Sequence, residues 1–333
     1  MTLPHDLLRS LSTASPDEAW AALSAFALDI FRPDIDPGKA VSEFSRRDRD
    51  VASADFYLST AGWDLWRDLD TATTHTADRL ADWWTQPHSK KAVLILDGLS
   101  LRELPFILSG ASAHGFTINT VAVTTSELPS ETTQFAQALG FAQRSSLSNN
   151  AAGNGHRLPG ARTECDDLPW LDCANMIGAE PYWVFWHHWP DSRVHDLSVA
   201  GQGLETLSKE AAEGLLSAEF WGFVDRLATG RRVIITSDHG YAAPGLFADA
   251  PAEQAKFLHD TFKSGRSAPG QGDTGPWVPP IAMSIASRRG DCRLALGRRK
   301  WKSQGGYPTL AHGGLSILEV LSPYVELTKQ GRA

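Results

Sequence analysis

Four short apolar or β-branched runs stand out in the hydrophobic pattern of the chain, and polar or turn residues follow them. They cover residues 92–96, 116–123, 182–186 and 233–236. Continuous apolar runs of this length indicate strands that are buried on both faces of a sheet. Stretches with helical periodicity separate several of these runs. The pattern therefore predicts an α/β fold with a mostly parallel sheet flanked by helices.

The first 88 residues have a different pattern, in which apolar positions recur at helical spacing. We expect a helical N-terminal region over residues 1–88 and one α/β domain over residues 89–333. Four tryptophans of the first region, at positions 63, 66, 83 and 84, suit base stacking or packing against the sheet. We expect packing, because tryptophan in an amphipathic helix usually contributes to a core.

The remaining segments give less regular patterns. Residues 144–164 read as a loop, and residues 204–228 as one long amphipathic helix closed by Gly230. Residues 241–280 read as an insertion that covers the site as a lid. Residues 281–299 alternate around Arg-Gly-Asp and predict a hairpin, and the apolar stretch after His312 predicts a closing helix.

Acidic and imidazole side chains follow the predicted strands. Asp97 follows the first strand, and two pairs follow later strands: Asp191 with His195, and Asp238 with His239. Asp97 alone would serve at least as well as a helix cap, and each histidine alone as an ordinary core or surface residue. In open parallel sheets, however, ligands collect at the carboxyl ends of the strands. We therefore expect a shared site there.

A sixth candidate ligand, His312, precedes the last helical pattern. Three carboxylates and three imidazoles without a thiolate suit Zn²⁺ or Mn²⁺. A hydroxyl near Pro129 is the candidate nucleophile, and the pattern leaves Ser126, Ser130 and Thr132 open. Ser130 is also a plausible helix N-cap.

Five blocks in order carry a family resemblance: LILDG, the helix start with Pro129 and Thr132, DSRVH, TSDHG and AHGG. Together they resemble the PglZ domain, a branch of the alkaline phosphatase superfamily, over roughly residues 90–327. The resemblance implies an alkaline phosphatase-like core with two divalent metal ions, Zn favoured and Mn as the alternative. It implies one metal site of Asp191, His195 and His312, and a second of Asp97, Asp238, His239 and the hydroxyl.

The resemblance also bears on the nucleophile. In many superfamily relatives the nucleophile stands two residues before a proline, and Glu127 occupies that position here. PglZ-like sequences have a threonine three residues after the proline, which favours Thr132 over Ser126 and Ser130.

The implied function is metal-dependent phosphoester hydrolysis, with a phosphodiester of a nucleotide or nucleic acid as substrate and a role in bacterial phage defence. A metal-binding scaffold or regulatory module with little turnover, acting with protein partners of such a system, is the alternative. Phosphomonoester or sulfate-ester hydrolysis is a third hypothesis, and the missing Cys-x-Pro-x-Arg run disfavours a sulfatase. Arg144, Arg193 and Arg298 are candidates for binding the non-bridging oxygens.

Composition and net charge limit the classes of protein to which this chain can belong. A net charge of −8 disfavours a general duplex-DNA binder, although a local basic groove stays compatible with it. The cluster Arg298, Arg299, Lys300 and Lys302 reads first as a solvated face and second as an anion site. Three cysteines, an N-terminus without signal-peptide order and the lack of a long apolar run predict a cytoplasmic protein without membrane association.

Overall fold

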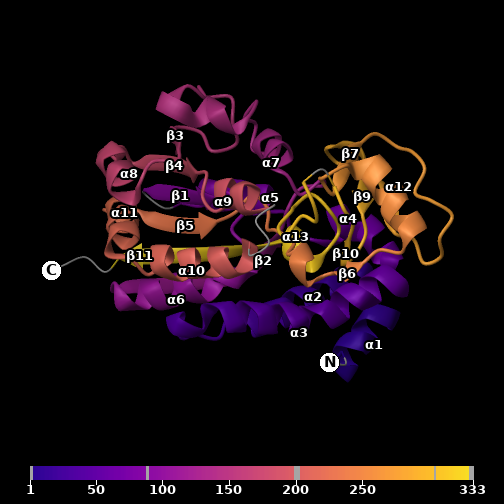
Figure 1. Ribbon diagram of the computed structural model, residues 1–333. Helices are drawn as coiled ribbons and strands as arrows, with labels where there is room; N and C mark the ends of the chain where they lie inside the picture. The colour runs from indigo at the N-terminus through magenta and orange to yellow at the C-terminus, as the bar shows by residue number, and fades with distance from the viewer. Residues whose placement is uncertain (1–2, 88–89, 199–202, 304, 330–333) are drawn as a thin grey trace.

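The computed structural model describes the chain except residues 1–2, 88–89, 199–202, 304 and 330–333. Helices pack on both sides of a central sheet, and a smaller group of strands lies at one end (Figure 1). The predicted fold class is confirmed: an α/β fold with a mostly parallel sheet, flanking helices and a helical N-terminal region. The predicted division of the chain at residues 88 and 89 lies outside the described residues.

The central sheet has six strands in the order β2-β11-β5-β1-β4-β3. Their bounds are β1 (Lys91–Leu96), β2 (Phe116–Thr125), β3 (Arg162–Asp166), β4 (Tyr182–His187), β5 (Arg232–Thr236) and β11 (Leu321–Lys329). Strand β1 pairs in parallel with both β4 and β5, and β3 pairs in parallel with β4. Strand β11 is antiparallel to both of its neighbours, β2 and β5.

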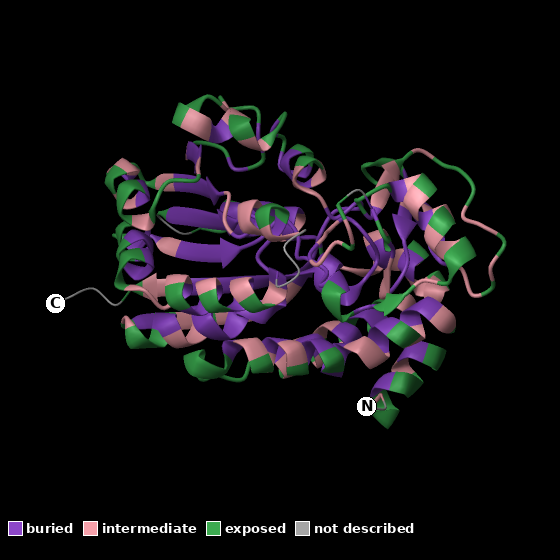
Figure 2. Ribbon diagram, in the orientation of Figure 1, coloured by how far each residue is buried: buried purple, intermediate pink, exposed green. Residues whose placement is uncertain are grey.

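The alternation of side chains along β1 divides the core into two layers. Ala92, Leu94 and Leu96 belong to one hydrophobic cluster, and Val93 and Ile95 belong to another. All five are fully buried, so the strand is covered on both faces, as its continuous apolar run predicts (Figure 2).

Helices from the N-terminal region supply part of each layer. They are α1 (His5–Thr13), α2 (Pro16–Phe31), α3 (Ala40–Thr60), α4 (Leu69–Ala72) and α5 (Thr76–Thr85). Helices α1 to α4 contribute to the first cluster, while α5 packs on the opposite face. Trp66, Trp83 and Trp84 are buried in these layers, which confirms packing for these three. Trp63 is half-buried against the first cluster.

The later helices complete both layers, except α9, whose Val194 packs in a separate small cluster. They are α6 (Leu104–Ala113), α7 (Thr132–Ala138), α8 (Trp170–Met176), α9 (Asp191–Leu197), α10 (Gly203–Leu215) and α11 (Ala218–Ala228). The single helix predicted over residues 204–228 is wrong. Ser217 caps a new helix by accepting a hydrogen bond from the Phe220 amide at 3.1 Å, which separates α10 from α11.

The chain between β5 and β11 builds the smaller group of strands. Its elements are β6 (Ala248–Asp249), α12 (Ala252–Phe262), β7 (Ser267–Pro269), β8 (Ala282–Ser287), β9 (Gly290–Ala295), β10 (Arg299–Lys300) and α13 (Ile317–Val320). The predicted hairpin is confirmed as β8 and β9, whose register joins Ser287 to Gly290. Helix α12 packs on this hairpin through a core of its own, so residues 241–280 include a packed helix and not only an insertion loop.

Two further expectations are wrong. The closing segment is strand β11, because Pro323 cannot continue the one-turn helix α13 and the alternating apolar residues fit a strand instead. The stretch predicted as a loop over residues 144–164 ends in β3. This short edge strand is largely polar and pairs with β4 alone, so its sequence lacks the apolar signal of the inner strands.

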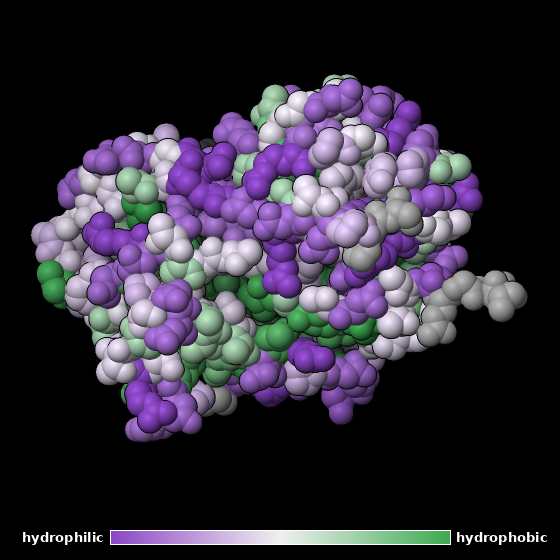
Figure 3. Space-filling model, turned by 180° about the vertical axis from the view of Figure 1, so that it is seen from behind, coloured by the Kyte–Doolittle hydropathy of each residue, from purple (hydrophilic) through white to green (hydrophobic). Residues whose placement is uncertain are grey.

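The surface carries both hydrophobic and hydrophilic side chains. On the face seen in Figure 3, hydrophobic side chains gather across the lower middle and hydrophilic ones cover most of the rest. No helix of the described residues has the length and apolar character needed to span a bilayer. The three cysteines are buried free thiols.

A buried charge network joins α3 to the rest of the core. Asp48 is fully buried and pairs with Arg102, which precedes α6, and with Arg298, which follows β9. Arg298 also pairs with Asp55 on α3 at 3.3 Å. Arg298 is therefore a core residue, and neither a solvated side chain nor a candidate for substrate binding.

The substitution Asp48→Ala should lower the free energy of unfolding by roughly 3–5 kcal/mol, because it leaves two buried guanidinium groups without their shared carboxylate. Urea denaturation monitored by circular dichroism measures the change. Asp260→Ala, which removes an exposed partner of Lys256, is the control and should leave the midpoint nearly unchanged. Equal effects of the two substitutions would contradict this account of Asp48.

Candidate metal centre

Three carboxylates meet where β1, β4 and β5 end. Asp97 directly follows β1, Asp191 begins α9 after β4, and Asp238 lies two residues after β5. These strands are neighbours and run in parallel, so their carboxyl ends lie at one edge of the sheet. All three aspartates are buried.

The backbone fixes these aspartates to one another. The Asp191 amide donates to the Asp97 carbonyl at 2.9 Å, and the Gly98 amide donates to Asp238 Oδ1 at 2.9 Å. Gly98 has a φ of +70°, and a Cβ at this position would lie 3.1 Å from the Asp191 side chain. Glycine is needed here both for the left-handed conformation and for the close approach of α9.

The first group of candidate ligands forms around Asp191. His195 lies one helical turn later on α9, and its Nε2 is 3.3 Å from Asp191 Oδ2. His312 comes from the loop before α13, with its Nε2 3.6 Å from Asp191 Oδ1 and 3.3 Å from His195 Nε2. One ligand atom from each of the three lies within 4.8 Å of the others, a spacing that suits one metal ion.

The second group forms around His239. Its Nε2 lies 3.4 Å from Asp238 Oδ2 and 3.8 Å from Asp97 Oδ1. Its Nδ1 is 2.9 Å from the Gly240 carbonyl, which favours a proton on Nδ1 and leaves Nε2 as the ligand atom. Asp97, Asp191 and His239 also lie within 4.8 Å of one another, so Asp191 belongs to both groups.

The three candidate hydroxyls have different surroundings. Thr132, the first residue of α7, places its Oγ1 3.3 Å from Asp97 Oδ1 and 3.4 Å from His239 Nε2. Ser126 donates instead to the Val320 carbonyl at 3.0 Å. Ser130 is buried, and its hydroxyl has no hydrogen-bond partner within the described residues. The helix N-cap is Glu131, not Ser130. The structure thus brings Thr132 to the acidic and imidazole cluster.

Burial and the neighbouring charges shift the pKa values of the clustered aspartates and of His239. Burial raises the pKa of Asp97 well above its ordinary value, and repulsion from Asp238 and Asp191 adds to this. Burial alone would lower the pKa of His239, but attraction to the three carboxylates outweighs it and raises this pKa to about 9. Burial would likewise raise the pKa of Asp191, but hydrogen bonding to His195 and the charges of His312 and His239 lower it overall.

Arg144 and Trp186 hold the remaining carboxylate oxygen of Asp97. Trp186 donates to Oδ2 at 3.0 Å, and the Arg144 guanidinium pairs with the same oxygen. Of the three arginines considered for substrate binding, Arg144 thus lies at the site. Arg193 instead pairs with Glu210 and Asp196, and Arg298 with the buried acids of α3.

Several buried polar atoms of the cluster make ion-pair contacts at most and no hydrogen bond within the described residues. Asp191 Oδ1, Asp238 Oδ2 and His312 Nδ1 have no hydrogen-bond partner within the described residues. A buried carboxylate oxygen that accepts no hydrogen bond is costly, and a bound cation would offset that cost. The donor set of oxygens and imidazole nitrogens therefore fits divalent metal ions such as Zn²⁺ or Mn²⁺. Which residues coordinate metal, and whether Thr132 is the nucleophile, stay predictions.

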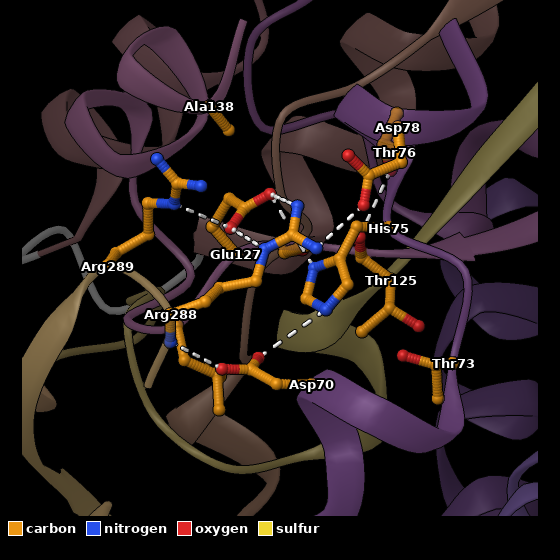
Figure 4. Close-up of polar contacts among 12 residues, drawn as sticks. Asp70, Thr73, His75, Thr76, Asp78, Thr125, Glu127, Ala138, Arg288 and Arg289 are labelled. Carbon is orange, nitrogen blue, oxygen red and sulfur yellow. Dashed lines mark hydrogen bonds and ion pairs between the residues drawn. The ribbon is translucent and has the colours of Figure 1, made fainter. Parts of the chain in front are cut away.

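The sequence pattern does not predict a charge cluster around Glu127, in the segment that leads to Thr132. Glu127 is buried, and Arg288 at the tip of the β8–β9 hairpin donates to both of its oxygens, at 2.7 and 2.8 Å (Figure 4). Arg289 adds an ion pair with Glu127 at 3.2 Å, and His75 lies 3.6 Å from it. Glu127 therefore anchors the segment instead of facing the metal ligands.

The chain matches no protein-family model and no curated protein. Among solved structures it is similar to murine ectonucleotide pyrophosphatase / phosphodiesterase 5, as an inactive variant in complex with AMP, at 10% identity and a TM-score of 0.40. The similarity covers 72% of this chain and 88% of that chain. The human protein of the same name gives the same identity and TM-score, with 71% of this chain and 87% of that chain covered. A likeness at this level assigns neither a family nor an activity.

Protein stripped by a chelator and reloaded should bind two equivalents of Zn²⁺ or Mn²⁺, measured by elemental analysis after dialysis. Metal at about 100 times its dissociation constant should stabilise the fold by about 2.7 kcal/mol per ion. Asp191→Asn should reduce the uptake most, because Asp191 belongs to both groups. Asp196→Asn, on the exposed side of the same helix, should keep full uptake. Equal uptake by both variants would rule out the predicted centre.

Proposed function

We propose that this chain is a metal-dependent phosphoesterase that uses Thr132 as its nucleophile. The observation that supports this most strongly is the contact of Thr132 Oγ1 with both Asp97 and His239, beside a second group built on Asp191. A hydroxyl next to two adjoining groups of metal ligands suits attack on phosphorus.

The residues divide into three roles. Asp191, His195 and His312 would hold one metal ion, and Asp97, Asp238 and His239 a second. When bound, these ions would activate the hydroxyl and stabilise negative charge on the oxygens around phosphorus. Arg144 is 27% exposed, so it can pair with Asp97 and still reach a non-bridging oxygen of a substrate.

The proposed reaction has two displacements at phosphorus. Thr132 Oγ forms a bond to phosphorus and releases its proton to water, while the ester bond breaks and the leaving oxygen departs with the bonding electrons. Water then displaces Thr132 from the phosphothreonine and restores the hydroxyl. Asp97 and His239 position Thr132 through the contacts described above.

We further propose a phosphodiester of a nucleotide or nucleic acid as the substrate, Zn²⁺ or Mn²⁺ as the metal, and membership of the PglZ branch of the alkaline phosphatase superfamily. The order of the five sequence blocks supports these assignments. The same resemblance supports a role in phage defence beside protein partners of that system. Three unpaired thiols fit a reducing, cytoplasmic setting.

Metal-loaded protein should hydrolyse bis(p-nitrophenyl) phosphate, and chelation or Asp238→Ala should abolish the release of p-nitrophenolate. Thr132→Ala should lower kcat by at least about a thousandfold, since it removes the attacking oxygen. Thr133→Ala, at the exposed neighbouring position, is the matched control and should stay within about twofold of wild type. Activity that survives chelation or Thr132→Ala would refute the proposal.

The alternative of a scaffold or regulatory module draws on a different surface. A groove of about 700 Å³ lies between α1 and α3, and its wall includes Leu8 and Phe56. The Phe56 residue is 69% exposed, which is unusual for a large apolar residue.

A scaffold would keep its protein partner after Thr132→Ala and lose it after Phe56→Asp, measured by affinity of the purified pair. Loss of the partner on Thr132→Ala, or its retention on Phe56→Asp, would count against the scaffold.

A further inference from the structure

A pocket of about 320 Å³ opens beside the candidate metal centre. His195 and His312 form part of its wall, and so does Glu131, the residue directly before Thr132. This volume is near the lower end of the range for small-molecule sites, about 300–1,000 Å³. A phosphate ester held at the metal centre would therefore extend one of its substituents into this pocket.

The pocket wall is rich in hydroxyl groups. Its serines are Ser198, Ser264, Ser267 and Ser303. Arg266 also lies on the wall, but its Nε donates to Glu319 at 2.8 Å and its Nη2 to the Gly297 carbonyl at 2.8 Å. Its side chain is only 2% exposed. Within the described part of the chain, the wall therefore has no lysine or arginine free to pair with an anion.

Glu131 gives the pocket a negative charge. The Ser267 hydroxyl on β7 donates to Glu131 Oε1 and fixes the direction of the side chain. Gly313, next to His312, leaves room for it: a Cβ at Gly313 would lie 3.0 Å from the same oxygen. A carboxylate accepts about four hydrogen bonds, so Glu131 has capacity beyond the bond to Ser267.

We propose that Glu131 determines specificity by selecting substrates whose group in this pocket is neutral and carries hydroxyls, such as the sugar of a nucleoside. A hydroxyl there donates to the Glu131 carboxylate, and the surrounding serines bind the other polar atoms. A second phosphate in the same place meets a carboxylate and finds no free lysine or arginine on the described wall. The inference depends on the proposed phosphoesterase activity.

The test uses two chromogenic diesters that differ by one phosphate. They are thymidine 5′-(p-nitrophenyl phosphate) and the same compound with a 3′-phosphate. Wild type should prefer the first by at least about tenfold in kcat/KM, because like charges oppose binding of the second. Glu131→Gln should reduce this preference to about twofold or less, chiefly through KM for the 3′-phosphorylated compound.

Two matched variants control for structure. Glu131→Asp keeps the charge and should keep the preference, and Glu253→Gln removes an exposed acid on α12 and should behave as wild type. The p-nitrophenyl phosphate diesters of glycerol and of methanol show which part of the substituent contributes to binding, because only glycerol carries free hydroxyls and neither carries a nucleoside ring. If the glycerol ester has the same kcat/KM as the thymidine ester, the hydroxyl groups alone account for the selection. If the thymidine ester has the higher kcat/KM, the nucleoside ring also contributes to binding. Either result supports the proposal.

Three results would overturn it: equal rates for the two thymidine compounds, a preference that survives Glu131→Gln, or a methyl ester cleaved as well as the thymidine ester. If wild type cleaves none of these esters, the proposed phosphoesterase function fails and this inference fails with it. If wild type cleaves them all without preference, the inference about Glu131 alone fails.

Discussion

The site depends on the mutual repulsion of three carboxylates that are buried together at one end of the sheet. Asp97, Asp191 and Asp238 are buried, and all three lie close to His239. Arg144, Trp186 and the Gly98 amide satisfy only some of their oxygens. Burial, with repulsion from the other two carboxylates, raises the pKa of Asp97, and attraction to all three outweighs burial and raises the pKa of His239. Burying such a cluster is costly, and divalent cations would offset that cost.

The rest of the fold serves to bring these groups together. Strands β4, β1 and β5 are adjacent and parallel, so three segments far apart in the chain end at one edge. Strand β11 extends the sheet beyond β5, and the loop before α13 brings His312 to Asp191. The hairpin tip with Arg288 fixes the segment before Thr132 through Glu127. Each contact joins distant parts of the sequence.

Local patterns could predict the inner strands and the acids that follow them. The run before Asp97 is apolar at every position because both faces of β1 are covered, and the spacing of Asp191 and His195 is one helical turn. Edge strand β3 and strand β11 lacked such a signal, since one is polar and the other follows a helical turn. Nor could the sequence reveal the pairing of Glu127 with Arg288 or of Asp48 with Arg298, because those partners meet only in the folded chain. For the same reason the local pattern left Ser126, Ser130 and Thr132 open, and only the family resemblance favoured Thr132 before their surroundings were known.

We propose that this edge of the sheet holds two metal ions, and anomalous scattering from crystals grown with Zn²⁺ or Mn²⁺ would locate them. We expect two peaks at the absorption edge of the metal, one among Asp191, His195 and His312 and the other among Asp97, Asp238 and His239. Crystals that contain the metal but show no peak within bonding distance of these side chains would contradict it.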